Sequence, residues 1–538
     1  MKVASIKGKI VIQGELHLKS PMIIGSGQDE IADIEVIKDS KGNPFIPATS
    51  ITGIIRHHFH ENYPAQSKEI DQFFGYSRKK SNKYLFCWNE IPGNDSNRLI
   101  DFLKLNYNID WVRTAKIEQI DNGKTIIVSV EKNNISLSLN NEKTKVNLKI
   151  DNVRTDEFIV KTESYKLNIY NNKKHESIQS AFICHDLYAQ KAHIRIRDGV
   201  KIDPSSQIAE DMGKYDFEII ENGAIFDLFW EVTVREIHDP NTFKQILATM
   251  ISPLEKGILP LGAKTNNGFG KCILKKLCIS QFEFSNKDDV LRWLKQDFSK
   301  STPKLDCESF EPKNHNKPFC IEARFAIKNS LIIRSYSEET KMPDATSITS
   351  NGKYVLPGTS VKGAIRHRAL KILKTLEIDN AQEQINNLFG TAGKNIDPIK
   401  GRVLIEEKKI KKVYPEIQNR IKIDRFTGGT IKTALFNSMP LWSNDHHDES
   451  VTIVIKIRNY KKWEAGLMLH VLKDLWSEDL PIGGEKNIGR GALKGNKATI
   501  TWKNKQLIIN SNVKGLDFSD DSLAIELNQY AKQVLEVI

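Results

Sequence analysis

Apolar and polar residues alternate near the start of the chain and again after its middle. Residues 10–18 and 319–327 both follow a period of two, which predicts β-strands with one buried face. Each strand is followed by apolar residues at helical spacing, over about 51–61 and 361–376. Further strands, a glycine-rich loop and a last helix complete each half. The order predicts two similar α+β modules.

The two halves also share sequence. Residues 47–57 recur at 357–367, 310 positions later, and seven of these eleven residues are identical. The glycine-rich loop that begins at 262 recurs 221 positions later, at 483. Because the second spacing is shorter, the first copy must carry about 89 extra residues. We expect this insertion at about 96–195, as antiparallel β-hairpins with one polar face.

These spacings predict the organisation of the whole chain. The first module covers 1–300, a linker rich in serine, proline and lysine covers 301–317, and the second module covers 318–538. A ferredoxin-like, RRM-like βαββαβ core with one antiparallel sheet is the simplest fold for each module.

Composition narrows the class of protein. The 538 residues are 39% hydrophobic, with no membrane-length apolar run and no signal peptide at the start, so we expect a cytoplasmic protein without membrane contact. The net charge of +12 favours anionic partners. The six cysteines form no C-x-x-C pair, which argues against a zinc ribbon or a disulfide framework.

The motif Pro-x-Thr-Ser-x-x-Gly-x-x-Arg-His opens both predicted helices. A threonine or serine N-cap and the free N–H groups of the first turn would create an anion site. Gly53 and Gly363 would let a phosphate approach closely, and Arg56 and Arg366 lie one turn further on. The alternative is a well-capped core helix in which the glycine serves packing.

The glycine-rich loops at 262–271 and 483–491 are neither Walker loops nor Rossmann fingerprints. Their backbone N–H groups and flanking cations could lie against a sugar-phosphate chain. An ordinary hairpin turn is the alternative.

The early strand, the helix-opening motif and the late glycine loop together resemble the RAMP superfamily of CRISPR-associated RNA-binding proteins. The closest likeness is to the backbone subunits of type III effector complexes, which polymerise along a guide RNA and cut the paired target RNA. The chain looks like a tandem fusion of two such subunits, as in type III-D variants. The resemblance implies guide (CRISPR) RNA, target RNA and other effector subunits as partners.

In such subunits an aspartate in the pattern Asp-x-x-Val-Ile-[Lys/Arg]-Asp is needed for target cleavage. Residues 33–39 match it and place Asp33 on that position, with Glu35 in place of the usual proline. Asp344 is the looser counterpart, because its Val-Ile-Lys-Asp continuation is gone. The resemblance implies metal-dependent RNA cleavage with Mg²⁺ held at these two aspartates. The neighbouring acids that could compete are Asp29, Glu30, Glu338 and Glu339.

The family also carries β-hairpin thumbs that displace a nucleotide at intervals. We place them around Lys201 and Pro204, and around Lys422 and Phe426. The residues expected to bind RNA are Ser50, Gly53, Arg56, His57, Arg197, Lys201, Lys264, Asn266, Gly268, Gly270, Lys271, Ser360, Lys362, Gly363, Arg366, His367, Lys422, Arg425, Lys486, Asn487, Gly489 and Arg490.

Two other functions stay open. The chain could be a non-catalytic double-RAMP scaffold that caps a complex, or a guide-RNA-processing endoribonuclease, which the doubled glycine loops disfavour. Histidines 57, 58 and 60 and the pair 446–447 lack companions at zinc spacing and are not expected to bind metal.

Overall fold

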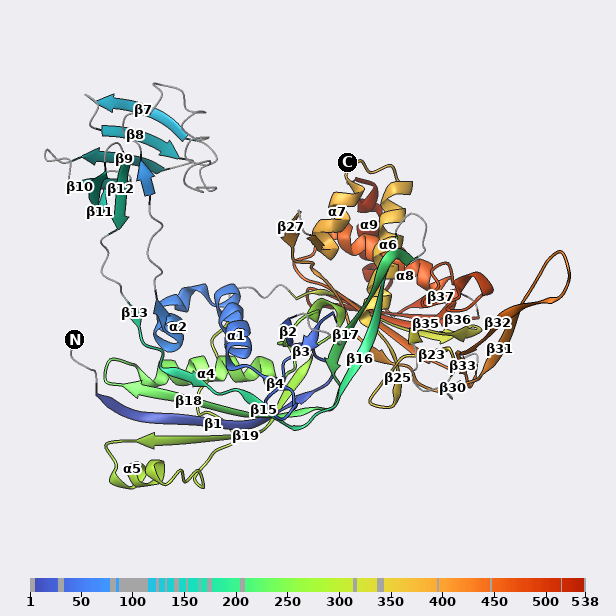
Figure 1. Cartoon of the computed structure of the whole chain (residues 1–538), viewed down its shortest axis with the longest axis horizontal. Helices are drawn as coiled ribbons and strands as arrows, with labels where there is room; N and C mark the ends of the chain where they lie inside the picture. The colour runs from blue at the N-terminus through green and yellow to red at the C-terminus, as the bar shows by residue number, and fades with distance from the viewer. Residues whose placement is uncertain are drawn as a thin grey trace. The chain divides into compact units, whose positions relative to one another are not determined.

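The structure is a computed structural model, and it divides into two units. The first comprises residues 1–67 and 182–538, and the second comprises 68–181 (Figure 1). The described residues are all except 1–4, 28–32, 78–83, 87–114, 122–124, 131–132, 140–144, 151–152, 164–165, 172–176, 204–208, 313–316, 336–342, 394–395, 446–447, 514 and 537–538.

The described part of the chain contains eight α-helices. They are α1 (Ala48–Asn62), α2 (Ser67–Phe74), α4 (Pro240–Glu255), α5 (Lys287–Leu294), α6 (Gly358–Thr375), α7 (Ala381–Phe389), α8 (Lys462–Trp476) and α9 (Asp521–Lys532). None of these described helices is long and apolar enough to cross a membrane.

The first module is built on four strands: β1 (Ile6–Leu18), β14 (Phe182–Cys184), β18 (Ile225–Arg235) and β19 (Cys272–Glu283). Helix α1 follows β1, and α4 follows β18, so the order is βαββαβ. In the sheet, β1 lies between β19 and β18, and β14 pairs with the far edge of β18, all antiparallel. This arrangement confirms the ferredoxin-like prediction for the first module.

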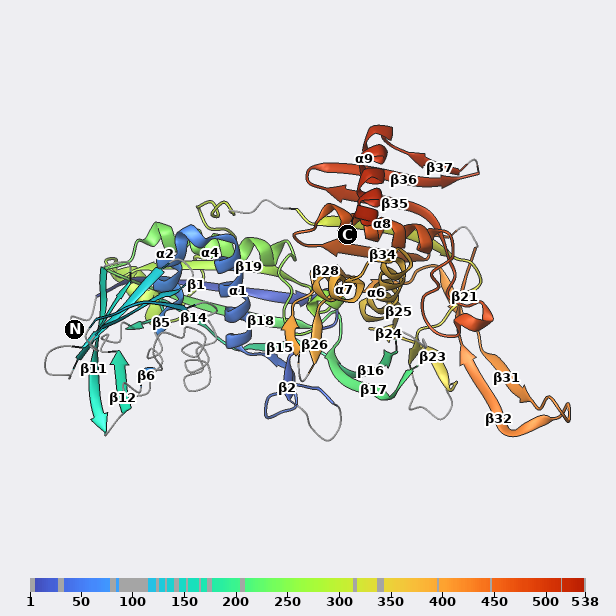
Figure 2. The ribbon, with the colours of Figure 1, turned by 90° about the horizontal axis from the view of Figure 1, so that it is seen from above.

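The second module repeats the arrangement with β20 (Phe319–Ile327), β28 (Val403–Ile405), β34 (Val451–Ile457) and β35 (Leu493–Trp502). Its sheet order is β28-β34-β20-β35, which equals the first module's order, with α6 and α8 as the two helices. Strands β36 (Lys505–Asn512) and β37 (Gly515–Phe518) extend the β35 edge (Figure 2).

The periodicities that predicted these elements match their buried faces. In β20 every second residue from Phe319 to Ile327 is buried, so one face of the strand packs on the core. In α6 the buried residues include Val361, Ile365 and Ala369, one helical turn apart, as Ile51, Ile55 and Phe59 are in α1. Each helix therefore covers its own sheet with one apolar stripe.

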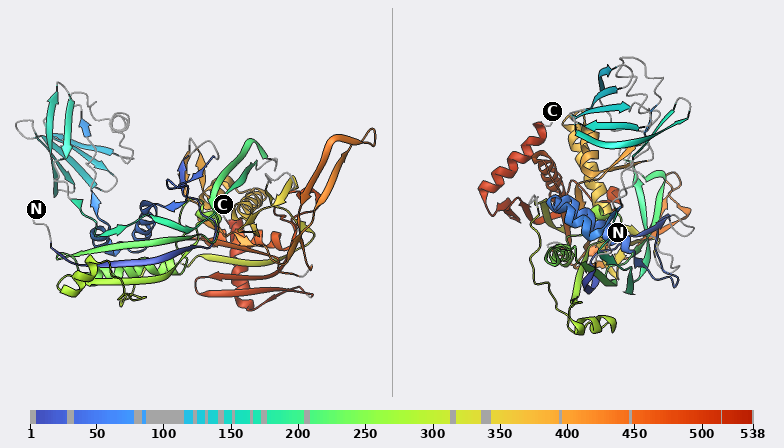
Figure 3. Two further views of the ribbon diagram at one scale, coloured as in Figure 1. Left: turned by 60° about the horizontal axis from the view of Figure 1, so that its bottom comes forward. Right: turned by 90° about the vertical axis from the view of Figure 1, so that its left-hand side faces the viewer.

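Two long β-hairpins rise from the modules between the second and third core strands. Thumb 1 consists of β16 (Ile194–Ile202) and β17 (Ala209–Ile220), and thumb 2 of β31 (Gln418–Ile423) and β32 (Thr430–Met439). Figure 3 (left) shows them as two-stranded ribbons, thumb 1 in green and thumb 2 in orange. Pro204 lies outside the described residues. The predicted hairpins are confirmed as structures.

Short strands frame the thumbs and helices. In the first module they are β2 (Gly25–Gly27), β3 (Glu35–Val36), β4 (Phe45–Ile46) and β15 (Leu187–Lys191). In the second they are β21 (Ser330–Leu331), β22 (Arg334–Ser335), β23 (Ala345–Ser347), β24 (Thr349–Ser350), β25 (Lys353–Leu356), β26 (Thr391–Gly393), β27 (Ile396–Ile399), β29 (Lys408–Lys409), β30 (Val413–Pro415) and β33 (Leu441–Ser443).

The second unit is an antiparallel meander. Its seven strands pair in the order β6-β12-β11-β10-β9-β8-β7, so chain neighbours from β7 to β12 are also sheet neighbours. They are β6 (Tyr84–Phe86), β7 (Ala115–Asp121), β8 (Thr125–Val130), β9 (Asn133–Leu139), β10 (Lys145–Ile150), β11 (Val153–Glu163) and β12 (Lys166–Asn171). Two further strands, β5 (Tyr76–Ser77) and β13 (Ser177–Ile178), pair with each other. The chain passes through β5 before the meander and through β13 after it.

Candidate nucleic-acid interface

Asp33 and Asp344 occupy equivalent places at the bases of the two thumbs. The backbone N–H of Asp33 donates to Asp216 Oδ1 at 3.3 Å, and the N–H of Asp216 donates back to Asp33 Oδ2 at 3.1 Å. Asp344 makes the same reciprocal pair with Asn437, at 2.7 and 3.0 Å. Both aspartates are exposed. Each is therefore displayed to solvent but tied to the second strand of its thumb.

The first aspartate's loop runs along thumb 1 over several residues. Ile34 accepts from the N–H of Glu218 at 2.9 Å, and the buried Glu218 carboxylate accepts from the N–H of Val36 at 3.0 Å. Lys38 completes the ladder with an ion pair to Glu218 at 2.9 Å. The Val-x-Lys part of the sequence motif thus serves to fix the loop that carries Asp33.

The second module keeps this path with different side chains. Ala345 pairs with Ser438 in parallel, as Ile34 does with Phe217. Ile348 donates to the Ile333 carbonyl at 2.9 Å, just as Ile37 donates to Ile24. Met439 stands where the first module has Glu218, so the motif lysine and its carboxylate partner are replaced together. The looser sequence match leaves the position of Asp344 unchanged.

Each motif helix begins about one turn earlier than expected. Helix α1 begins at Ala48 and α6 at Gly358, with Pro47 and Pro357 as N-caps. Neither helix has a side-chain cap, so the prediction of a threonine or serine N-cap is wrong. Proline fits there because its fixed φ leads into the first turn. Ser50 and Ser360 consequently lie inside the first turn, half-buried.

Gly53 and Gly363 are exposed on these helices, and no described atom lies within 4 Å of the place where a Cβ would sit. Glycine in a helix interior costs roughly 0.5–1 kcal/mol relative to alanine. Packing within the described chain gives no reason for this cost. An outside partner that approaches the helix backbone would give one.

Cations gather on the second module's motif helix. Arg366 donates to the Gly390 carbonyl and to Asn386 Oδ1, both at 2.9 Å, which ties α6 to the end of α7. Burial and the neighbouring guanidinium groups of Arg366 and Arg458 lower the pKa of Lys362 to about 8. Burial and the charges of Lys486 and Arg366 also lower the pKa of His367. A bound phosphate would relieve this mutual repulsion.

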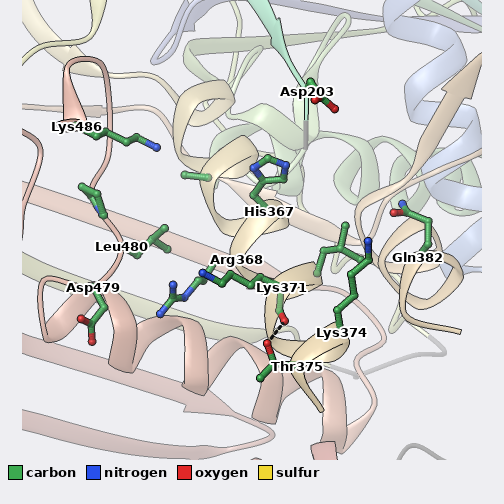
Figure 4. A pocket seen from close by; sticks show the side chains of 13 residues that line it. Asp203, His367, Arg368, Lys371, Lys374, Thr375, Gln382, Asp479, Leu480 and Lys486 are labelled. Carbon is green, nitrogen blue, oxygen red and sulfur yellow. Dashed lines mark hydrogen bonds between the residues drawn. The ribbon is translucent and has the colours of Figure 1, made fainter. Parts of the chain in front are cut away.

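A pocket of about 740 Å³ lies along the same helix (Figure 4). Its cationic side chains come from α6 and from the second glycine loop, and Asp203 reaches it from the end of β16. Arg368 is already paired with Asp474 at 2.6 Å. The basic residues of the lining are His367, Arg368, Lys371, Lys374 and Lys486.

The glycine loops are tight structural turns. Gly262 and Gly483 have positive φ, and a Cβ at either would collide with the carbonyl of Ile23 or Ile332. Gly270 and Gly491 press in the same way on the residue before the first glycine of each loop. Only glycine fits a positive φ beside a carbonyl at such close range. These glycines are thus needed for folding whatever the loop binds.

The two loops are supported by opposite chemistry. The Lys264 ammonium lies 3.6 Å from the ring centre of Phe217 and 4.8 Å from that of Tyr215, and burial lowers its pKa to about 8. At the equivalent place the second loop has Glu485, which is paired with three arginines. These are Arg334 at 2.7 Å, Arg420 at 2.9 Å and Arg490 at 3.1 Å.

The first glycine loop and thumb 1 contact the second module. Arg197 and Glu407 form a buried two-pronged ion pair, 3% and 5% exposed, with a shortest distance of 2.6 Å. Asn266 donates to the Gly401 carbonyl at 2.8 Å, and Gly268 lies against the backbone of Glu407. Lys271 lies 3.7 Å from Glu406. These side chains form the joint between the modules.

In the second module, the equivalent loop residues are exposed. Lys486, Asn487 and Gly489 face solvent, whereas Arg490 is buried beside Glu485. Thumb 2 exposes apolar side chains next to the predicted cations Lys422 and Arg425, which are themselves exposed. The exposed apolar residues of thumb 2 are Ile421, Ile423, Phe426, Ile431, Leu435 and Phe436.

The remaining predicted residues are placed as follows. Lys201 is exposed and paired with Glu210 at 2.6 Å. His57 is exposed and lies 2.9 Å from Glu61, and Arg56 is half-buried with a partner of its own. Several predicted residues lie outside the described part of the chain: Asp29, Glu30, Glu338, Glu339, His446 and His447. Within the described part, no group of three or more histidine, cysteine, aspartate or glutamate side chains could hold a metal ion.

The two modules with their motif helices, glycine loops and thumbs can now be compared with known families. The RAMP superfamily model matches residues 15–273 and 325–494, one region in each module. The chain belongs to the RAMP superfamily. Members of this superfamily are generally CRISPR-associated RNA-binding proteins. A search of curated proteins gives no match to the chain.

In this RAMP protein, sequence reasoning missed the residues that contact the predicted site residues from distant parts of the chain. Asp216 and Asn437 follow no motif, and each becomes visible only when a thumb strand is laid beside an aspartate loop. Glu407 neutralises Arg197 from 210 residues away. The helical spacing of Lys371 and Lys374 behind His367 was the one available sign of the basic face on α6.

Proposed function

We propose that this RAMP protein is a guide-RNA-binding backbone subunit of a type III CRISPR effector complex, a tandem fusion of two backbone modules. Each module would hold guide RNA along its motif helix, and the second module would also hold it along its exposed glycine loop. Asp33 and Asp344 would cut the paired target RNA at two sites. At the joint, the second module receives the glycine loop and thumb of the first. In the same way, another effector subunit would receive the exposed glycine loop and thumb of the second module.

The observation that carries the proposal is the equivalence of the two aspartates. Each is exposed and held by the same reciprocal pair at the base of a thumb, although the surrounding motif survives in one copy alone. A solvated loop acid without a role would have no reason to keep this geometry twice. The exposed helix glycines and the cations around Lys362 support binding of an RNA phosphate backbone to the motif helices.

The chemistry needs few groups because RNA carries its own nucleophile. The 2′-OH can attack the adjacent phosphate, so the protein must hold that geometry and receive the hydroxyl proton near a carboxylate. The Oδ1 oxygen of Asp33 or Asp344, which has no hydrogen-bond partner among the described residues, fits Mg²⁺, because this ion binds through one or two carboxylates plus substrate phosphates rather than through a protein cage. When bound, the ion would neutralise phosphate charge at the cut.

The test is cleavage of an end-labelled target RNA by the purified assembly with its guide, with and without Mg²⁺. We expect two cuts at fixed spacing. Asp33→Ala should remove one cut and Asp344→Ala the other, without change in guide affinity. Two intact cuts in the double variant would refute cleavage by these aspartates and favour the non-catalytic scaffold.

A further inference from the structure

The reciprocal hydrogen bonds of Asp33 and Asp344 use one half of each carboxylate. In both modules Oδ2 accepts from the thumb backbone, at 3.1 and 3.0 Å. Within the described chain the other oxygen, Oδ1, has no hydrogen-bond partner at either aspartate. A carboxylate held in this way cannot rotate freely about its χ angles, because turning it would break the bond from the thumb.

The thumb residue that completes each pair lies at the same place on the second strand of its hairpin. It is Asp216 on β17 and Asn437 on β32. Their shared property is a side-chain oxygen that accepts the aspartate's N–H while their own N–H donates back. An amide oxygen and a carboxylate oxygen both serve as acceptors, so aspartate and asparagine are interchangeable for this purpose.

We propose that Asp216 and Asn437 are positioning residues for the two cuts. Each fixes the loop and the rotamer of its aspartate so that Oδ1 is presented to the target strand. Neither has to touch RNA. This inference rests on the proposed function, because it assumes that Asp33 and Asp344 act in cleavage.

The arrangement also couples each cut to its own thumb. The thumb strand that would lie against the RNA holds the aspartate at its base, so the two features are aligned by a single register of β-pairing. In the first module Ile34 pairs with Phe217, next to Asp216, and in the second Ala345 pairs with Ser438, next to Asn437. A misplacement of about 1 Å can cost about 100-fold in rate.

The experiment uses the full chain in its assembled, guide-loaded form and measures the single-turnover rate of each cut. Asp216→Ala should slow the cut that Asp33→Ala removes by about 10- to 100-fold and leave the other cut unchanged. Asn437→Ala should do the reverse. The unaffected cut on the same molecule reports correct folding and guide loading in every reaction.

Two conservative variants separate positioning from a general loss of structure. Asp216→Asn and Asn437→Asp each install the residue that the other module uses. Both variants should keep the rates of the two cuts near those of the wild type. Asp227→Ala is the control, since Asp227 is an exposed carboxylate on β18, outside both thumbs, and accepts from Gln190 rather than holding a loop aspartate. It should change neither cut.

The outcomes are distinguishable. Normal rates for both cuts in Asp216→Ala and Asn437→Ala would overturn the positioning roles, as would an equal slowing of both cuts by either variant. If Asp33→Ala and Asp344→Ala themselves leave cleavage intact, the proposed function fails independently of this inference.

Discussion

Gly53 and Gly363 are the residues that the protein interior explains least. Each lies on an exposed part of a helix, and no described neighbour requires a missing Cβ. Packing does not offset the stability that a helix loses at such a glycine, so the reason for the glycine lies in a partner outside the chain. At Gly262 and Gly483 the reverse holds, because positive φ and a close carbonyl account for the glycine completely.

Alanine at the exposed helix glycines should therefore separate stability from binding. We expect Gly53→Ala and Gly363→Ala to raise the free energy of unfolding by about 0.5–1 kcal/mol each, measured by chemical denaturation. The same variants should weaken guide RNA binding because the added methyl blocks a close phosphate. Gly262→Ala should instead destabilise the protein. Unchanged guide affinity in both helix variants would remove the argument for RNA contact there.

The depressed pKa of Lys362 gives a pH dependence with a defined sign. A guide phosphate favours the charged ammonium, so its pKa rises on binding from the value of about 8 in the free protein. The Lys362 contribution to affinity is therefore complete below about pH 8 and is lost as pH rises through the pKa of the complex.

We expect guide affinity to fall by about tenfold more between pH 7 and 10 in the wild type than in Lys362→Met. Fluorescence anisotropy with a labelled guide would measure the difference. Lys505→Met is the control, because Lys505 lies on β36 and is paired with Glu526 of α9. Equal pH profiles for wild type and Lys362→Met would contradict the assignment.

At this scale the sequence revealed residue types better than residue roles. Asp33, Gly53 and Lys362 could be selected because each lies within a recognisable motif. That Arg197 and Arg490 are buried in ion pairs could not be seen, since a basic residue in a hairpin reads the same whether its partner is a phosphate or a distant carboxylate. The proline N-caps were missed because serine and threonine follow so closely in the motif.

At the scale of elements, the joint between the modules depends on one buried ion pair. Arg197 of thumb 1 and Glu407, after β28, are almost completely excluded from water. Removing one partner of such a pair leaves a buried charge, which typically costs about 3–5 kcal/mol. The joint should therefore be more sensitive to a single substitution than to a double one.

We expect Arg197→Met to lower the free energy of unfolding by about 3 kcal/mol, and Arg197→Met combined with Glu407→Met to recover much of the loss. Thermal and denaturant unfolding would measure both. Glu416→Gln, on an exposed residue, is the control and should have little effect. A double variant as unstable as the single one would show that packing, rather than charge, holds the joint.

The order of elements was predictable because strand and helix periods repeat in both halves. The ferredoxin-like strand order followed from βαββαβ, as sequence alone allows few other antiparallel solutions. Pairings that join segments far apart in the chain, such as Ile34 with Phe217, were not predictable, because such short bridges have no period. The insertion's bounds depend on the criterion: sequence offsets suggest about 96–195, and packing separates 68–181.

For the whole molecule, the second module shows that the fold closes without an insertion. There β26 and β27 are joined by two residues, where the first module has the long excursion between β5 and β13. The strand pair at the base is the same in both. The first unit should therefore fold without residues 78–176.

A chain in which residues 78–176 are replaced by a two-residue Asn-Gly turn should retain cooperative unfolding and guide binding. Circular dichroism on heating and a guide-binding titration would check both. The expected change in unfolding midpoint is small, since buried residues of the first module such as Val11, Phe73 and Leu228 are all kept. Loss of soluble, guide-binding protein would mean that the excursion is needed for folding of the first unit.

The two glycine loops are held by different residues, and this difference limits how the duplicated gene can recombine. Unequal crossing-over between the repeats would delete one module and leave a hybrid. Such a hybrid, when it joins thumb 1 to the second glycine loop, would set the Glu485 carboxylate against the faces of Tyr215 and Phe217 and remove its partners Arg334 and Arg420. We expect this product to fold poorly. Divergence of these supports thus protects the tandem from reverting to a single copy.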